Sequence, residues 1–251
     1  MKYKIHLDLD GVFCDFDESI EEKFKDNTVV LVLKDELKKA KELVMRLYAN
    51  DLKKFINENE YVDGPELLKT YVKYLQTSGL EVPSELKAWK KLSTKFNELK
   101  FKIAGKRGFF LNLKPMSSCH ELFDFVSTVD PNPTFLTAPI GDGNIEKEHF
   151  CAEEKRAWVD REFAGRNFEF ICTGDKWKYA KSDNPDEIHI LMDDRGKYIK
   201  PWISHGGVGI LHTSVENSIQ QLKKIIENNN TTSESILRNY VKQMISEHVK
   251  Y

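Results

Sequence analysis

The chain has 251 residues and a formal net charge of −2 at pH 7. Because 40% of its residues are hydrophobic and 31% are charged, it can bury a sizeable core beneath a well-solvated surface. This composition excludes a wholly disordered chain and argues against a uniformly basic nucleic-acid binder. No apolar run has the length of a membrane span, and the first residues lack the pattern of a signal peptide. We therefore expect no membrane association, a cytoplasmic location and four reduced cysteines.

Short apolar runs bounded by turn residues predict buried parallel strands. Helical patterns lie between them, including Ile145 to Phe163 and Ser214 to Glu227. Because strands and helices alternate, we predict the α/β class with a Rossmann-like parallel sheet. The expected strands are Lys4 to Leu9, Thr134 to Thr137, Phe168 to Cys172, Ile188 to Met192 and Val208 to Leu211.

A long interval with hardly any strand signal separates the first two strands. Its apolar spacing predicts helices over Lys34 to Glu58, from Gly64-Pro65 to near Gly79, and over Ser84 to Leu99. We therefore expect three parts in the chain. They are an α/β core at 1–16 and 108–227, a helical cap insertion at 17–107 (below, the helical insertion), and a polar linker with a C-terminal amphipathic helix at 228–251.

The helical insertion contains a basic stretch. From Ser84 to Arg107 there are eight basic and two acidic residues, a local charge of +6 in an otherwise acidic chain. A phosphate-rich ligand would explain this charge. A solvated helix face is the simpler explanation, since the stretch has no alternating aromatic residues, and the sequence leaves both interpretations open.

Polar residues follow four of the predicted strands at the point where each strand ends. Because ligands bind at the carboxyl ends of the strands in open α/β sheets, we expect these side chains to meet at one edge. Carboxylates, a hydroxyl and an ammonium are what a magnesium-dependent aspartyl phosphotransferase needs. The candidates are Asp8 and Asp10 after the first strand, Thr137 at the end of the second, Lys176 after the third, and Asp193 and Asp194 after the fourth.

With these motifs the chain resembles the haloacid dehalogenase superfamily of phosphohydrolases, and more closely the 5′(3′)-deoxyribonucleotidases. The resemblance covers Met1 to Phe16 and Gly108 to Leu211, and it does not clearly cover the helical insertion. It rests on Asp8-Leu9-Asp10-Gly11-Val12 with Asp15-Phe16, Gly108-Phe109-Phe110-Leu111-Asn112-Leu113-Lys114-Pro115, Thr137-Ala138-Pro139-Ile140, Glu154-Lys155-Arg156-Ala157-Trp158-Val159, Thr173-Gly174-Asp175-Lys176, and Ile190-Leu191-Met192-Asp193-Asp194-Arg195.

The resemblance implies a role for each catalytic candidate. Asp8 would be the nucleophile that becomes an aspartyl-phosphate, and Asp10 would be the acid and base. Thr137 and Lys176 would hold the phosphoryl oxygens. Mg²⁺ would be bound by the Asp8 carboxylate, the Asp10 backbone carbonyl and Asp193, with Asp194 acting directly or through water.

The resemblance also implies a set of substrate-binding positions. Two aromatic rings in it could instead belong to the core, and Lys155 could equally be a solvated helix residue. Ala138 stands where the family commonly has Ser, which removes a hydroxyl from the phosphate end of the site. The set is Phe16, Phe110, Ala138, Lys155 and Arg195.

The expected activity is hydrolysis of nucleoside monophosphates, with deoxyribonucleotides preferred. Two enzymatic alternatives stay open: a phosphatase acting on a polynucleotide end, which the basic stretch would favour, or on another small phosphomonoester. A third alternative is a non-catalytic nucleotide-binding protein, although such a protein would not need a nucleophile beside a metal. The sequence leaves the oligomeric state open.

Overall fold

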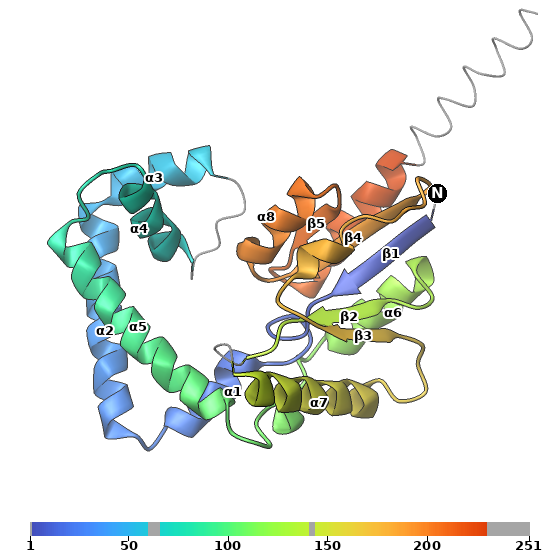
Figure 1. Cartoon of the computed structure of the whole chain (residues 1–251), viewed down its shortest axis with the longest axis horizontal. Helices are drawn as coiled ribbons and strands as arrows, with labels where there is room; N and C mark the ends of the chain where they lie inside the picture. The colour runs from blue at the N-terminus through green and yellow to red at the C-terminus, as the bar shows by residue number, and fades with distance from the viewer. Residues whose placement is uncertain (1, 60–65, 141–143, 230–251) are drawn as a thin grey trace, which may run out of the picture.

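Five parallel strands form a single sheet in the computed structural model, which describes residues 2–59, 66–140 and 144–229 (Figure 1). The strand order is β3-β2-β1-β4-β5, so β1 lies at the centre between β2 and β4. The predicted α/β class and parallel sheet are confirmed. The strands are β1 (Lys2–Leu7), β2 (Thr134–Thr137), β3 (Glu169–Cys172), β4 (Glu187–Asp193) and β5 (Val208–Leu211).

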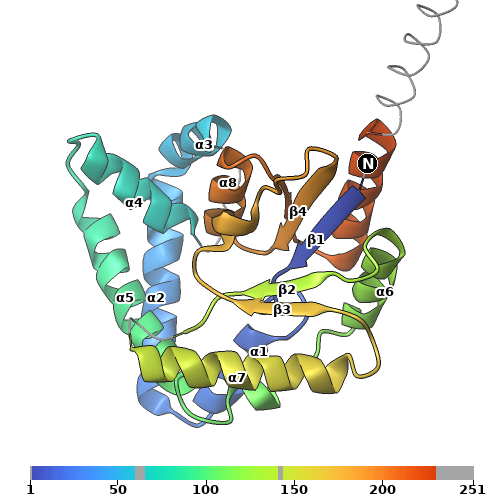
Figure 2. The ribbon, with the colours of Figure 1, turned by 45° about the vertical axis from the view of Figure 1, so that its right-hand side comes forward.

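Helices cover both faces of this sheet. Successive residues of a strand point to opposite faces, so each strand packs against helices on both sides. Phe135 and Met192 belong to the cluster that includes α6, α7 and the helix at 215–229, whereas Leu136 and Leu191 pack with α8 on the opposite face. Figure 2 shows α7 and α8 on opposite sides of the sheet. The named helices are α6 (Cys119–Val129), α7 (Ile145–Glu162) and α8 (Gly196–Ser204).

The chain between β1 and β2 is helical, and the helices from α2 to α5 lie to one side of the sheet (Figure 1). Leu52, Phe55, Leu68 and Trp89 belong to a hydrophobic cluster separate from the clusters on the sheet. The predicted helical insertion is therefore confirmed. Its elements are α1 (Phe16–Phe24), α2 (Thr28–Leu47), α3 (Ala49–Glu58), α4 (Leu67–Thr77) and α5 (Ser84–Ala104).

The predicted helix from Lys34 to Glu58 was wrong in its extent. The chain forms two helices there. The first, α2, already begins at Thr28 and ends before Tyr48, and α3 begins directly after Tyr48. The Asn27 side chain accepts a hydrogen bond from the Val30 amide and so caps α2. The Tyr48 hydroxyl donates to Glu85 on α5 at 3.2 Å, a tertiary contact that sequence periodicity does not reveal.

Other helix ends differ less from the prediction. The third predicted helix of the insertion, which is α5 in the structure, extends past Leu99 to Ala104. The last described helix continues to residue 229 rather than ending at Glu227. The fourth helix, α4, ends at Thr77 just before Gly79, whose φ of +69° suits glycine at a helix end. Gly64-Pro65 and the expected C-terminal amphipathic helix lie outside the described residues.

The described helices lack the combination of length and apolar character that crossing a membrane requires. All four cysteines are free thiols: Cys14, Cys119 and Cys151 are buried and Cys172 is half-buried. Most of the thiols are therefore buried, and their reduced state stays a prediction.

Candidate active site

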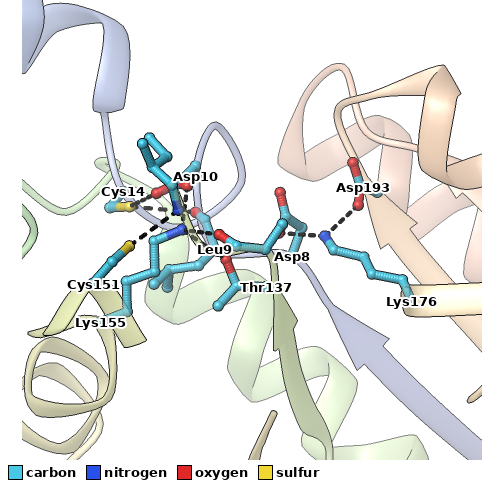
Figure 3. Close-up of polar contacts among 11 residues, drawn as sticks. Asp8, Leu9, Asp10, Cys14, Thr137, Cys151, Lys155, Lys176 and Asp193 are labelled. Carbon is cyan, nitrogen blue, oxygen red and sulfur yellow. Dashed lines mark hydrogen bonds and ion pairs between the residues drawn. The ribbon is translucent and has the colours of Figure 1, made fainter. Parts of the chain in front are cut away.

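Backbone hydrogen bonds hold the carboxyl ends of the central strands together. The Asp8 amide, just after β1, donates to the Met192 carbonyl at 2.9 Å, and the Thr173 amide donates to the Thr137 carbonyl at 2.7 Å. The His212 amide, after β5, donates to the Asp193 carbonyl at 2.9 Å. Because these bonds continue the strand register, the predicted side chains lie close together at one edge of the sheet (Figure 3).

Lys176 joins the first and last motifs. Its Nζ atom donates to Asp8 Oδ1 at 2.5 Å and to Asp193 Oδ2 at 2.6 Å, and the side chain is almost fully buried (Figure 3). The Tyr198 ring lies under the ammonium, 4.4 Å from Nζ to the ring centroid. Burial opposes the charge, yet the Asp8 and Asp193 carboxylates outweigh it and raise the pKa of Lys176. The ammonium therefore stays charged between two carboxylates.

Lys155, on α7, joins Asp10 to the end of β2. Its Nζ atom donates to Asp10 Oδ2 at 2.6 Å, to Thr137 Oγ1 at 3.1 Å and to the Ala138 carbonyl at 2.7 Å. Its side chain is fully buried, so the interpretation of Lys155 as a solvated helix residue was wrong. Burial opposes its charge, but Asp10 outweighs that effect and raises the pKa of Lys155. Asp10 and Asp8 are thus held by different lysines.

Gly11 allows the turn after β1 to approach the acidic pair. Its φ is +81°, and a Cβ atom at this position would lie 2.6 Å from Asp194 Oδ2. The Gly11 amide donates to the Cys14 carbonyl at 2.9 Å, and the Cys14 thiol donates to Asp10 Oδ1 at 3.5 Å. Glycine is therefore required here both by the backbone conformation and by the space that Asp194 occupies.

The carboxylates fit a divalent cation. Oxygen atoms of Asp8, Asp193 and Asp194 lie within 4.8 Å of one another, and Asp194 Oδ1 is buried without a hydrogen-bond partner among the described residues. Burial and then the nearby Asp8 raise the pKa of Asp193 to about 7 and that of Asp194 to about 8. A cation would favour the ionised forms, and oxygen ligands suit Mg²⁺. The Asp10 carboxylate binds Lys155 instead, and metal binding by its carbonyl stays a prediction.

A cavity of about 350 Å³ opens beside these groups. It is lined by Asp8, Asp10 and Asp194 together with Phe16, Ala138 and Arg195, which were expected to contact substrate. Sequence reasoning missed Phe101, Lys197 and Tyr198, which also line it. Phe101 lies on α5 beyond the predicted end of that helix, so no sequence pattern indicated that it lines a cavity. Lys197 and Tyr198 follow Asp193-Asp194 closely in the sequence, and this proximity was the one indication that they could lie near the site.

Phe110 does not line the cavity. Its ring is 1% exposed, and the Lys155 ammonium lies 4.8 Å from its centroid. Phe16 stacks on it at a centroid distance of 6.3 Å. Phe110 and Lys155 thus lie behind the cavity wall, where they position Phe16, Asp10 and Thr137. Their expected contact with substrate has no support in this arrangement, because sequence alone does not show which aromatic faces the solvent.

No protein-family model matches the chain, and no curated protein matches it by sequence. Several solved structures match the chain with low similarity. A hydrolase from Streptococcus pneumoniae TIGR4 is 15% identical with a TM-score of 0.39, covering 89% of this chain and 100% of that one. L-2-haloacid dehalogenase from Xanthobacter autotrophicus is 10% identical, with a TM-score of 0.38 and coverages of 83% and 76%.

A putative β-phosphoglucomutase from Thermotoga maritima is 16% identical with a TM-score of 0.35, covering 90% of this chain and 100% of that one. These structures are hydrolases and a mutase with differing names, and the identities and TM-scores are low. The reaction therefore has to be argued from the chemistry of the site.

Proposed function

We propose that this protein is a phosphomonoesterase of the haloacid dehalogenase type that uses Mg²⁺ and hydrolyses nucleoside monophosphates. The observation that carries the proposal is the Asp8–Lys176–Asp193 bridge beside Asp10 and Asp194. A nucleophile, a charged ammonium and a cluster of carboxylates at one edge of the sheet suit the transfer of a phosphoryl group.

In the first step, an Asp8 carboxylate oxygen attacks phosphorus and the bond from phosphorus to the ester oxygen breaks. Asp10 donates a proton to the leaving oxygen, which departs as an alcohol. Lys176 opposes the negative charge of the phosphoryl group, since its ammonium already contacts Asp8. The product of this step is an aspartyl-phosphate on Asp8.

In the second step, Asp10 takes a proton from water as the water oxygen attacks phosphorus. The bond between phosphorus and the Asp8 oxygen breaks, which releases phosphate and restores the carboxylate. Asp8, Asp193 and Asp194 would hold Mg²⁺, which when bound neutralises phosphoryl charge. Lys155 keeps the Asp10 carboxylate in place through its contact of 2.6 Å.

Two aromatic side chains in the cavity support a nucleoside substrate. Phe16 and the half-exposed Phe101 both line the cavity, where a base could stack on either ring. They come from different helices of the insertion, α1 and α5. The four free thiols suit a cytoplasmic location, which is part of this proposal.

Phosphate release from a panel of deoxyribonucleoside and ribonucleoside monophosphates, with and without Mg²⁺, tests the proposal. We expect release that requires Mg²⁺ and disappears in Asp8→Asn, because an amide cannot form the acyl-phosphate. Good turnover of a sugar phosphate with none of any nucleotide would contradict the nucleotide assignment. Stoichiometric nucleotide binding without release from any phosphomonoester would show a binding protein instead.

A further inference from the structure

A second cavity, of about 310 Å³, lies between α4 of the helical insertion and α8 beside the sheet. Figure 1 shows that these two helices come from different parts of the fold. Each helix contributes two lysines one turn apart to the lining. The four are Lys69, Lys73, Lys197 and Lys200.

The positive charge of this cavity is only partly neutralised. Glu66 is the one acidic residue of the lining, and it already pairs with Arg195 at 2.6 Å and with Lys69 at 3.3 Å. In the described part of the chain, no carboxylate forms an ion pair with the other three lysines. Burial and then Arg195 lower the pKa of Lys197, so a bound anion would stabilise its charged form.

The second cavity shares a lining residue with the cavity beside Asp8 (below, the catalytic cavity). Lys197 lines both, and the Arg195–Glu66 pair links a residue of the catalytic cavity to a residue of the second. The two cavities are therefore neighbours along α8, and this helix marks the path by which a ligand with one end near Asp8 would reach Lys200. Lys73 faces that path from the other side, on α4.

We propose that the cavity between α4 and α8 is a subsite for a second phosphate group of the substrate, held by Lys73, Lys197 and Lys200. This inference rests on the proposed phosphatase function and adds that phosphomonoesters with a further phosphate are preferred over simple nucleoside monophosphates. Convergent ammonium groups suit a phosphate because each can donate a charge-assisted hydrogen bond to it.

The second phosphate can be of two chemical kinds. They differ in charge and in whether the phosphorus carries a further nucleoside. It is a terminal phosphate in a small bisphosphate and a phosphodiester in an oligonucleotide. Matched substrates distinguish them: thymidine 5′-monophosphate, thymidine 3′,5′-bisphosphate and the dinucleotide pTpT, with glucose 6-phosphate and glucose 1,6-bisphosphate as a pair without a base.

The test compares kcat/KM for these substrates in the wild type and in Lys73→Ala/Lys200→Ala. We expect the wild type to prefer the doubly phosphorylated member of a pair by about tenfold or more, the usual worth of hydrogen bonds to charged groups. The double variant should lose most of that preference. A preference confined to pTpT assigns the subsite to a phosphodiester, and a preference for either bisphosphate assigns it to a terminal phosphate.

Lys90→Ala/Lys95→Ala is the matched control, since it removes the same charge from exposed positions on α5 outside both cavities. Equal kcat/KM for every matched pair in the wild type overturns the subsite while leaving the phosphatase intact. An equal loss of preference in both double variants also overturns it, because the effect would then be one of overall charge.

A binding measurement decides the inference even if no substrate turns over. Titration calorimetry of wild type and Lys73→Ala/Lys200→Ala with thymidine 3′,5′-bisphosphate should show about tenfold weaker binding in the variant. Absence of turnover together with this difference contradicts the proposed function but supports an anion site. Equal affinity of the two proteins for this ligand and, in the same titration, for pTpT overturns the site itself.

Discussion

Asp8 and Asp10 are two residues apart, yet each carboxylate contacts a different buried lysine. Lys176 comes after β3 and holds Asp8, whereas Lys155 comes from α7 and holds Asp10. The two acids therefore sit in different electrostatic surroundings. Such a separation of neighbouring carboxylates is what a mechanism with one nucleophile and one acid-base group requires.

Replacing Asp10 should affect proton transfer without removing the nucleophile. We expect Asp10→Asn to reduce turnover of a nucleotide about 100-fold or more, the usual worth of general acid-base catalysis. p-Nitrophenyl phosphate has a better leaving group, so its first step should recover in part. Rapid mixing should then show a burst of nitrophenol followed by slow turnover, and an unchanged steady-state rate would contradict the role of Asp10.

Gly11 tests the contact between the first and last motifs. In Gly11→Ala, the φ of +81° and the clash with Asp194 should lower the free energy of unfolding by about 1–2 kcal/mol and weaken Mg²⁺ binding. Gly174→Ala is the matched control, since nothing lies within 4 Å of its added Cβ. Urea unfolding and the Mg²⁺ dependence of phosphate release measure both effects. Equal behaviour of the two variants would contradict this account.

At the scale of elements, α7 organises much of the site. Glu154 accepts hydrogen bonds from the Gly108 and Phe110 amides, and Trp158 Nε1 donates to the Leu113 carbonyl at 2.8 Å. The chain returning from the helical insertion is thereby fixed on α7. Lys155, which directly follows Glu154 on the same helix, binds Asp10. One helix thus connects the insertion to Asp10.

The N-terminus of α2 offers a test of local helix stability. Asn27→Ala removes the side-chain acceptor for the Val30 amide and should lower the free energy of unfolding by about 1 kcal/mol. Thermal and urea denaturation measure this change. Ser118→Ala at the N-cap of α6 is the control, because Ser118 makes no such bond and should change little. A larger loss in Ser118→Ala than in Asn27→Ala would contradict the capping argument.

At the scale of the whole molecule, the catalytic cavity is built from both parts of the fold. Phe101 comes from the helical insertion, whereas Tyr198 comes from α8 beside the sheet. The Glu66–Arg195 pair connects the two at 2.6 Å. We therefore expect substrate selection to depend on how the insertion sits on the sheet, whereas Asp8 and Asp193 are positioned by the ends of β1 and β4.

The buried acidic pair predicts how stability changes with pH. Because the pKa of Asp193 is raised to about 7 and that of Asp194 to about 8, the metal-free fold favours their protonated forms. Their contribution is fully present below the usual pKa near 4 and is lost as pH rises toward 8. We expect Asp194→Asn to reduce this decline in the free energy of unfolding, measured by urea titration from pH 4 to 8 in chelator.

Mg²⁺ should reverse that trend, because it binds the ionised carboxylates. At 100 times its Kd, a ligand adds about 2.7 kcal/mol, so Tm should rise by several degrees at pH 8 and less at pH 6. Asp194→Asn should show little of this increase. A Tm shift that is equal at both pH values, or equal in wild type and variant, would contradict a metal site at these residues.

The sequence by itself determined the sheet and the residues at its edge. Apolar runs mark buried strands, and parallel strands place their carboxyl ends together, so Asp8, Thr137 and Asp193 could be expected to meet. It also indicated the helical insertion, whose amphipathic spacing is a local property. These predictions succeed because the hydrophobic period of a strand or helix depends on neighbouring residues along the chain.

Only the tertiary structure decided which side chains contact one another. Lys155 lies in a helix rich in charged residues, and nothing in that pattern separates a buried lysine from a solvated one. Phe110 and Phe101 are both aromatic, yet one lies in the core and the other lines the cavity. At the break between α2 and α3, the Tyr48 hydroxyl likewise bonds Glu85, which is 37 residues away. Burial and pairing depend on elements distant in sequence, and local spacing carries no information about them.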